Sequence, residues 1–198
     1  MGVLDRILLF ITGLLAAYQV VVGVEGLGTL VLASYTIAFG VLLVACLLLI
    51  ILGFEVLNSP VVVVVSTIIP LSLSLGLVAE YLSQLALPYL IFVILGFLGV
   101  LFTRLASTGK IAVIVLTIVH GISGLVIFIL PFMLSLSGVT QLGFMLVGVG
   151  GALIGIGGVL LSFLKAGKAI LPRDTILSLF PVLLLLMTVA FVAGFALA

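Results

Sequence analysis

One side chain in this sequence combines acid–base chemistry with a position far from water. His120 lies inside an apolar run, roughly 15 Å from its nearer end at about 1.5 Å of rise per residue. An ionisable group at that depth is a functional hypothesis by default, because its burial in hydrocarbon is costly. It could relay protons, ligate a haem iron or contact a substrate. The structural alternative is a neutral histidine bonded to a helix carbonyl or a neighbouring hydroxyl. Thr117, Gly121 and Gly124 share its helical face, so we expect His120 and Thr117 to point into the protein.

No further groups complete a catalytic, metal or cofactor site around this histidine. A bound metal needs several His, Cys or carboxylate ligands from facing helices, whereas the chain has one His and one Cys. Asp5 and Asp174 fall at the ends of apolar runs, so they do not form the in-membrane pair of an aspartyl protease. Gln19, within the first apolar run, is better explained as a hydrogen-bonding group between helices than as a ligand. We therefore expect no enzymatic activity, no cofactor and no metal site.

The composition excludes a water-soluble protein. Charged residues make up 6% of the 198 residues and apolar residues 66%, with a mean hydropathy of +1.78; a soluble domain carries about a quarter charged residues. Six Lys and Arg against five Asp and Glu leave a net charge of +1, so nucleic acid is excluded as a partner. The elements that position His120 must then be helices, which satisfy their own backbone hydrogen bonds within a bilayer.

Apolar runs separated by turn residues or charges predict an all-α polytopic membrane helix bundle with seven transmembrane helices, in a single domain of residues 1–198. The predicted spans cover residues about 7–24, 29–53, 60–81, 86–103, 111–136, 141–164 and 174–197.

The distribution of charge predicts the orientation of this bundle. With an odd number of spans, every basic residue falls on one side: Arg6, Arg104, Lys110, Lys165, Lys168 and Arg173. Because basic loops stay in the cytoplasm, we expect a cytoplasmic N-terminus and an outside C-terminus, integral to a cell membrane. Glu55 lies on the same side, where Arg104 or Lys110 could be its ion-pair partner across the bundle.

Small residues at helical spacing mark faces where helices pack closely. Lipid is as apolar as leucine, so association in a bilayer depends on backbones that can approach each other. The clearest such face lies in the sixth span and consists of Gly148, Gly151, Ala152, Gly155 and Gly158. Gly151 and Gly155 form a GxxxG pair within it. This face either packs inside the bundle or receives a helix from another copy or another subunit.

These features favour a non-catalytic integral membrane protein that acts as a structural or accessory subunit. The short loops, the scarcity of polar site residues and the small-residue faces all point in this direction. The expected partners are the lipid bilayer and other transmembrane helices, from its own copies or from other subunits. The alternative is a small homo-oligomeric transporter or channel for a neutral or lipophilic solute.

Overall fold

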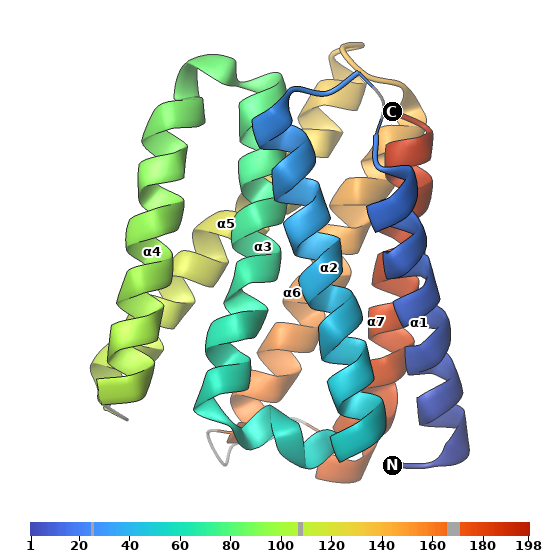
Figure 1. Cartoon of the computed structure of the whole chain (residues 1–198), viewed down its shortest axis with the longest axis vertical. Helices are drawn as coiled ribbons and strands as arrows, with labels where there is room; N and C mark the ends of the chain where they lie inside the picture. Colours follow the sequence, from blue (N-terminus) through green and yellow to red (C-terminus); the bar gives the residue numbers. More distant parts are fainter. Residues whose placement is uncertain (25, 107–108, 166–170) are drawn as a thin grey trace.

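The computed structural model describes residues 1–24, 26–106, 109–165 and 171–198, which form a bundle of long helices (Figure 1). The described chain is 89% helical and has no strands. Its long helices are α1 (Val3–Val22), α2 (Thr29–Leu52), α3 (Pro60–Tyr81), α4 (Ala86–Ala106), α5 (Lys110–Leu136), α6 (Met145–Lys165) and α7 (Arg173–Ala196). Short 3₁₀ helices precede three of them: η1 (Phe54–Asn58), η2 (Ser83–Leu85) and η3 (Leu142–Phe144). Within the described residues, seven helices are long and apolar enough to span a membrane, as the sequence predicted.

One difference from the predicted helix boundaries is at the start of α1. The sequence predicts a start at about residue 7, but α1 begins at Val3. The Gly2 amide donates to the Asp5 carboxylate at 2.6 Å, so this carboxylate caps the helix and faces the positive end of its dipole. Asp5 and Arg6 therefore belong to the first turn of α1 rather than to a loop before it.

All the long helices except α4 form a closed ring. α1 packs on α2, α2 on α3, α3 on α5, α5 on α6, α6 on α7, and α7 packs back on α1. α4 lies outside this ring, at the left edge of the bundle in Figure 1, and its main contacts in the described chain are with α3 and α5. Val100 is the one residue of α4 that is buried. α4 is therefore held from one side, whereas α3, which contacts α2, α4 and α5, is the most buried helix.

Aromatic side chains fill the ring toward the end where the C-terminus lies. Tyr35 and Phe39 of α2 meet Phe191 and Phe195 of α7, and the ring centroids of Tyr35 and Phe195 are 4.6 Å apart. Phe144 of η3 packs edge-on against Phe195. A cavity of about 10 Å³ beside Phe39 and Phe191 has an apolar lining and is at most large enough for about one water molecule. This end of the described ring interior is therefore a packed core.

Glycines let large side chains enter this core. Gly76 of α3 lies directly against the ring of Tyr35, so a methyl group there would overlap it. Gly150 of α6 lies against Phe191, where an added Cβ would be 2.6 Å from the ring. Interiors this dense do not absorb an added methyl group without a shift of neighbouring atoms. The helix spacing of the ring thus depends on small residues, as expected for a bundle in lipid.

The end of the bundle that carries the N-terminus also carries the basic residues. Five of them lie at helix termini there: Arg6, Arg104, Lys110, Lys165 and Arg173. Lys168 lies outside the described residues. We call this end the basic end; the chain terminates at the opposite end (Figure 1), where Glu80 is exposed near the last residue of α3.

Candidate functional site

His120 lies near the middle of α5, at the border between the packed face of this helix and its outer surface. The packed face carries Val119, Ser123 and Ile127, all buried. His120 follows Val119, a rotation of about 100°, and its side chain is half-buried. Thr117 is turned further from the packed face and is exposed. The prediction that Thr117 points into the bundle is therefore wrong, because α5 packs through the face that carries Val119, Ser123 and Ile127.

Gln19 is buried but forms its hydrogen bond within its own helix. Its side chain is 5% exposed, and its amide nitrogen donates to the carbonyl oxygen of Gly23 at 3.2 Å. The Gly23 N–H donates back to the Gln19 carbonyl at 2.9 Å. The last turn of a helix leaves carbonyl groups without helical partners. Gly23 is the C-cap residue that follows the last residue of α1, Val22. The hydrogen bond from Gln19 to Gly23 therefore caps the end of α1 and is not the predicted bond between helices.

Several buried hydroxyls of the bundle are satisfied in the same local way. Thr12, Ser34, Thr67 and Thr188 each donate to the carbonyl oxygen of the residue four positions earlier, at 2.7–2.8 Å. This bond lets a hydroxyl lie inside a helix bundle without a partner on another helix. These side chains therefore have a structural explanation and carry no argument for a ligand site.

Four buried side-chain atoms of the described residues have no hydrogen-bond partner, and all of them belong to α4 and α5. They are Tyr89 Oη, Arg104 Nε, His120 Nδ1 and Ser123 Oγ. A buried polar group without a partner costs on the order of 1–3 kcal/mol, so such groups are retained rarely and call for an explanation. Their common location makes the seam between α3, α4 and α5 the candidate functional site.

Three hydroxyls converge in this seam from three different helices. The Tyr89 hydroxyl of α4 interacts with the side chains of Ser74 on α3 and Ser123 on α5, but neither Tyr89 Oη nor Ser123 Oγ forms a hydrogen bond with good geometry. Ser74 and Ser123 are fully buried. Ser74 Oγ donates to the Pro70 carbonyl oxygen at 2.7 Å, so toward Tyr89 it can only accept. Measured along α3 and α5, Ser74 and Ser123 both lie about 20 Å from the basic end.

His120 and Arg104 extend the seam toward the basic end. His120 precedes Ser123 by almost one turn, about 5 Å along α5. Arg104 lies in the last turn of α4, and its guanidinium is close enough for its charge to act on His120. Arg104 Nε is buried without a hydrogen-bond partner, although the residue lies at the basic end. We call Arg104, His120, Ser123, Tyr89 and Ser74 the polar ladder.

Sequence reasoning singled out His120 but missed Tyr89 and Ser123. Tyr89 follows Pro88 at the start of α4, where a tyrosine usually marks the membrane interface. Ser123 is an isolated hydroxyl in an apolar helix. The available signal was its spacing of three residues from His120, since residues three apart share a helix face.

The small residues of α6 divide into an inner and an outer part. Gly148 and Gly151 are buried against α5, and a Cβ on Gly151 would lie 2.9 Å from an isoleucine side chain of that helix. Ala152 is half-buried. Gly155 and Gly158 are exposed, and a Cβ on Gly155 would meet no atom within 4 Å. The part of the predicted face nearer the basic end therefore lies on the surface of the chain.

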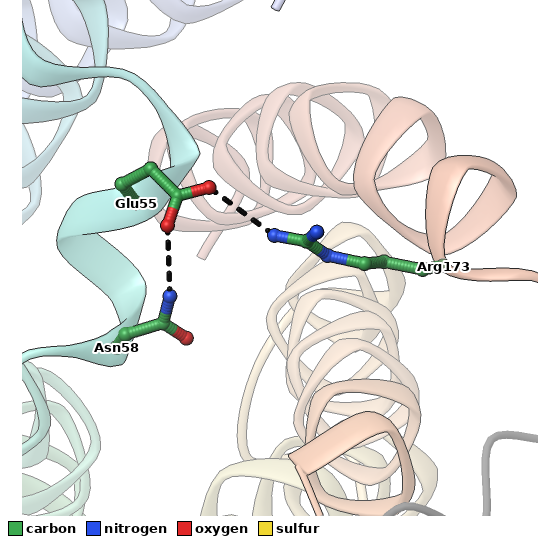
Figure 2. A network of polar contacts seen from close by, with 3 residues as sticks. All are labelled: Glu55, Asn58 and Arg173. Carbon is green, nitrogen blue, oxygen red and sulfur yellow. Dashed lines mark hydrogen bonds and ion pairs between the residues drawn. The ribbon is translucent and has the colours of Figure 1, made fainter.

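A cleft at the basic end is the second polar feature of the molecule. Its volume is about 310 Å³, and it is lined by Phe54, Leu57, Asn58, Leu161, Leu164, Arg173 and Leu177. Glu55 accepts hydrogen bonds from Arg173 at 3.2 Å and from Asn58 at 3.1 Å (Figure 2). Its ion-pair partner is thus Arg173 and not Arg104 or Lys110, because η1 lies beside the start of α7. Both side chains of the pair are more than half exposed, so the pair contributes at most about 1 kcal/mol.

Neither metal ligation nor thiol chemistry is indicated by the described residues. They contain no group of three or more His, Cys, Asp or Glu side chains that could hold a metal ion, and Cys46 is a buried free thiol. Comparisons of the chain with protein families, curated proteins and solved structures gave no match.

Proposed function

We propose that this chain is a non-catalytic membrane subunit that packs against a transmembrane helix of another protein along the outer surface of α5 and α6. One observation carries the proposal: glycines lie on this surface without an internal packing role. A Cβ at Gly121, Gly124 or Gly155 would meet no atom within 4 Å. We call these three residues the open glycine surface.

The antiparallel register of α5 and α6 brings these glycines to similar depths. Gly151 packs against Ile127 and Phe128, so one turn nearer the basic end Gly155 comes level with Gly124. At this level neither glycine faces the other helix closely, since a Cβ on either would meet no atom within 4 Å. In Figure 1 α5 and α6 diverge toward the basic end. Small residues thus line two diverging helices where a third helix can approach both backbones.

The energetics favour an external partner over lipid at this surface. A glycine inside a helix is about 1 kcal/mol less favourable than alanine. Gly148 and Gly151 offset this through close contacts with α5, but the open glycine surface has no such contacts within the chain. In a bilayer, small residues stabilise association because they let another helix come close and gain van der Waals contact. The partner we propose is an apolar helix whose larger side chains fill this surface.

The proposed orientation places the basic end of the bundle in the cytoplasm. The reason is the positive-inside rule, applied to the basic residues that lie at the helix termini of that end. The N-terminus would then be cytoplasmic and the C-terminus outside, and the open glycine surface would lie near the middle of the membrane.

The packed ring argues against transport through a single copy. Toward the end with the C-terminus the ring is filled by aromatic side chains, and the cavity beside Phe39 and Phe191 measures about 10 Å³, less than the volume of most solutes. A transporter built from this chain would need a path between copies, which would place an identical chain at the surface and not another subunit.

Leucine substitutions that fill the open glycine surface test the proposal. Gly155→Leu and Gly121→Leu should fold and insert but release the chain from its assembly, because the added side chains occupy the place of the partner helix. Gly40→Leu on α2 is the matched control, since a Cβ at Gly40 also meets no atom within 4 Å. The measurement is blue native electrophoresis after gentle extraction. Assemblies of unchanged size for Gly155→Leu, or equal loss with the control, would show that this surface is not the interface.

A further inference from the structure

We propose that Tyr89, Ser74 and Ser123 form a membrane-buried water site, reached along the polar ladder from the basic end. The inference is independent of the proposed function, because the seam between α3, α4 and α5 is distinct from the open glycine surface.

The hydrogen-bonding capacities of the three hydroxyls match one water molecule. Tyr89 and Ser123 each have a hydroxyl group that forms no hydrogen bond of good geometry within the protein, and water can accept a proton from both. Ser74 already donates to Pro70, so its oxygen can accept a proton from the same water. A buried water typically makes about three hydrogen bonds to polar groups that are otherwise unsatisfied.

The surroundings of the hydroxyls exclude a much larger ligand. Leu71, Val100 and Val119 form a small apolar core between α3, α4 and α5. The ring of Phe92 packs at a tilt against Tyr89, with ring centroids 5.2 Å apart. An occupant of this site must satisfy the hydroxyls without displacing these side chains, which water can do.

The other members of the polar ladder supply the route. His120 lies about 5 Å nearer the basic end than Ser123 along α5. Its Nδ1 forms no hydrogen bond of good geometry, although the imidazole interacts with the backbone of Leu116. Arg104 Nε is the next such group, in the last turn of α4. Val100 of α4 is buried against α3 and α5 between Arg104 and Tyr89, so water reaches the site only when α4 separates from these helices. Because α4 lies outside the ring, such a movement leaves the aromatic core closed.

Radiolytic hydroxyl-radical labelling of the full chain in lipid nanodiscs tests the proposal, because side chains beside bound water are oxidised even when bulk solvent does not reach them. The readout is the oxidation rate of Tyr89 by peptide mass spectrometry. Tyr35 is the internal control, since it is 4% exposed and packed in the aromatic core. We expect Tyr89 to be oxidised several-fold faster than Tyr35.

Two serine variants separate bound water from exposure at the membrane surface. Ser123→Ala removes one of the three hydroxyls and should lower the Tyr89 rate several-fold, with the Tyr35 rate unchanged. Ser34→Ala is the matched control, because the Ser34 hydroxyl already donates to Leu30 within α2, and it should leave Tyr89 unaffected. If Ser123→Ala perturbs folding, seen as faster oxidation of Tyr35, the comparison is made with Ser74→Ala. A Tyr89 rate that no serine variant lowers, or that equals the Tyr35 rate, overturns the proposal.

Discussion

Two alanine substitutions one turn apart on α6 should change stability in opposite directions. Gly151→Ala places a methyl group 2.9 Å from Ile127 Cγ2 and 3.0 Å from the backbone nitrogen of Phe128. A backbone atom cannot move aside without shifting α5, so we expect overpacking to lower the free energy of unfolding by about 1–3 kcal/mol. The higher helix propensity of alanine offsets about 1 kcal/mol of this loss. Gly155→Ala meets open space, so the same propensity should stabilise the isolated chain by up to about 1 kcal/mol.

The free energy of unfolding of the purified single chain, measured by reversible denaturation in bicelles with circular dichroism, distinguishes the two variants. Gly40→Ala is a second control that should behave like Gly155→Ala, since a Cβ there also meets no atom within 4 Å. A Gly151→Ala variant stabilised as much as Gly155→Ala would contradict the close packing of α5 and α6. A destabilised Gly155→Ala would contradict the open glycine surface, because the added methyl group would then meet a neighbour within the chain.

Three further substitutions test separate parts of the account. Gly76→Ala should lower the free energy of unfolding by forcing Tyr35 out of its position, and adding Tyr35→Leu should restore part of this loss. If the double variant is no more stable than Gly76→Ala in the same denaturation assay, this contact does not limit the packing of α2 and α3. Glu55→Gln should change the free energy of unfolding by less than about 1 kcal/mol, since the ion pair with Arg173 is exposed to solvent. A larger loss of stability would show that this ion pair is shielded from solvent. His120→Ala should leave the size of the native assembly unchanged on blue native electrophoresis, and dissociation would assign this histidine an assembly role that the proposal does not contain.

The helices could be predicted from the sequence because each is an apolar run bounded by turn residues or charges. The structure moves the start of α1 to Val3, since the Asp5 carboxylate caps the first turn. The neighbours of each helix could not be predicted in the same way. In lipid no amphipathic pattern separates an inner from an outer face, so nothing in the apolar run of α4 shows that it lies outside the ring.

The candidate site was predicted only in part for a related reason. His120 stood out because an imidazole in an apolar run is rare, but its neighbours were assigned to the wrong face. The small residues around Thr117 resembled a packing face, whereas the helix packs through Val119 and Ser123. Tyr89 and Ser74 come from other helices, and only the spatial arrangement brings their hydroxyls toward Ser123.

The most direct test of the central claim is native mass spectrometry of the protein extracted gently from its own membrane. The account predicts a complex in which this chain is bound to a different membrane protein at fixed stoichiometry. A monomer, or an assembly made only of identical copies, would contradict it and would make solute flux in liposomes the next quantity to measure.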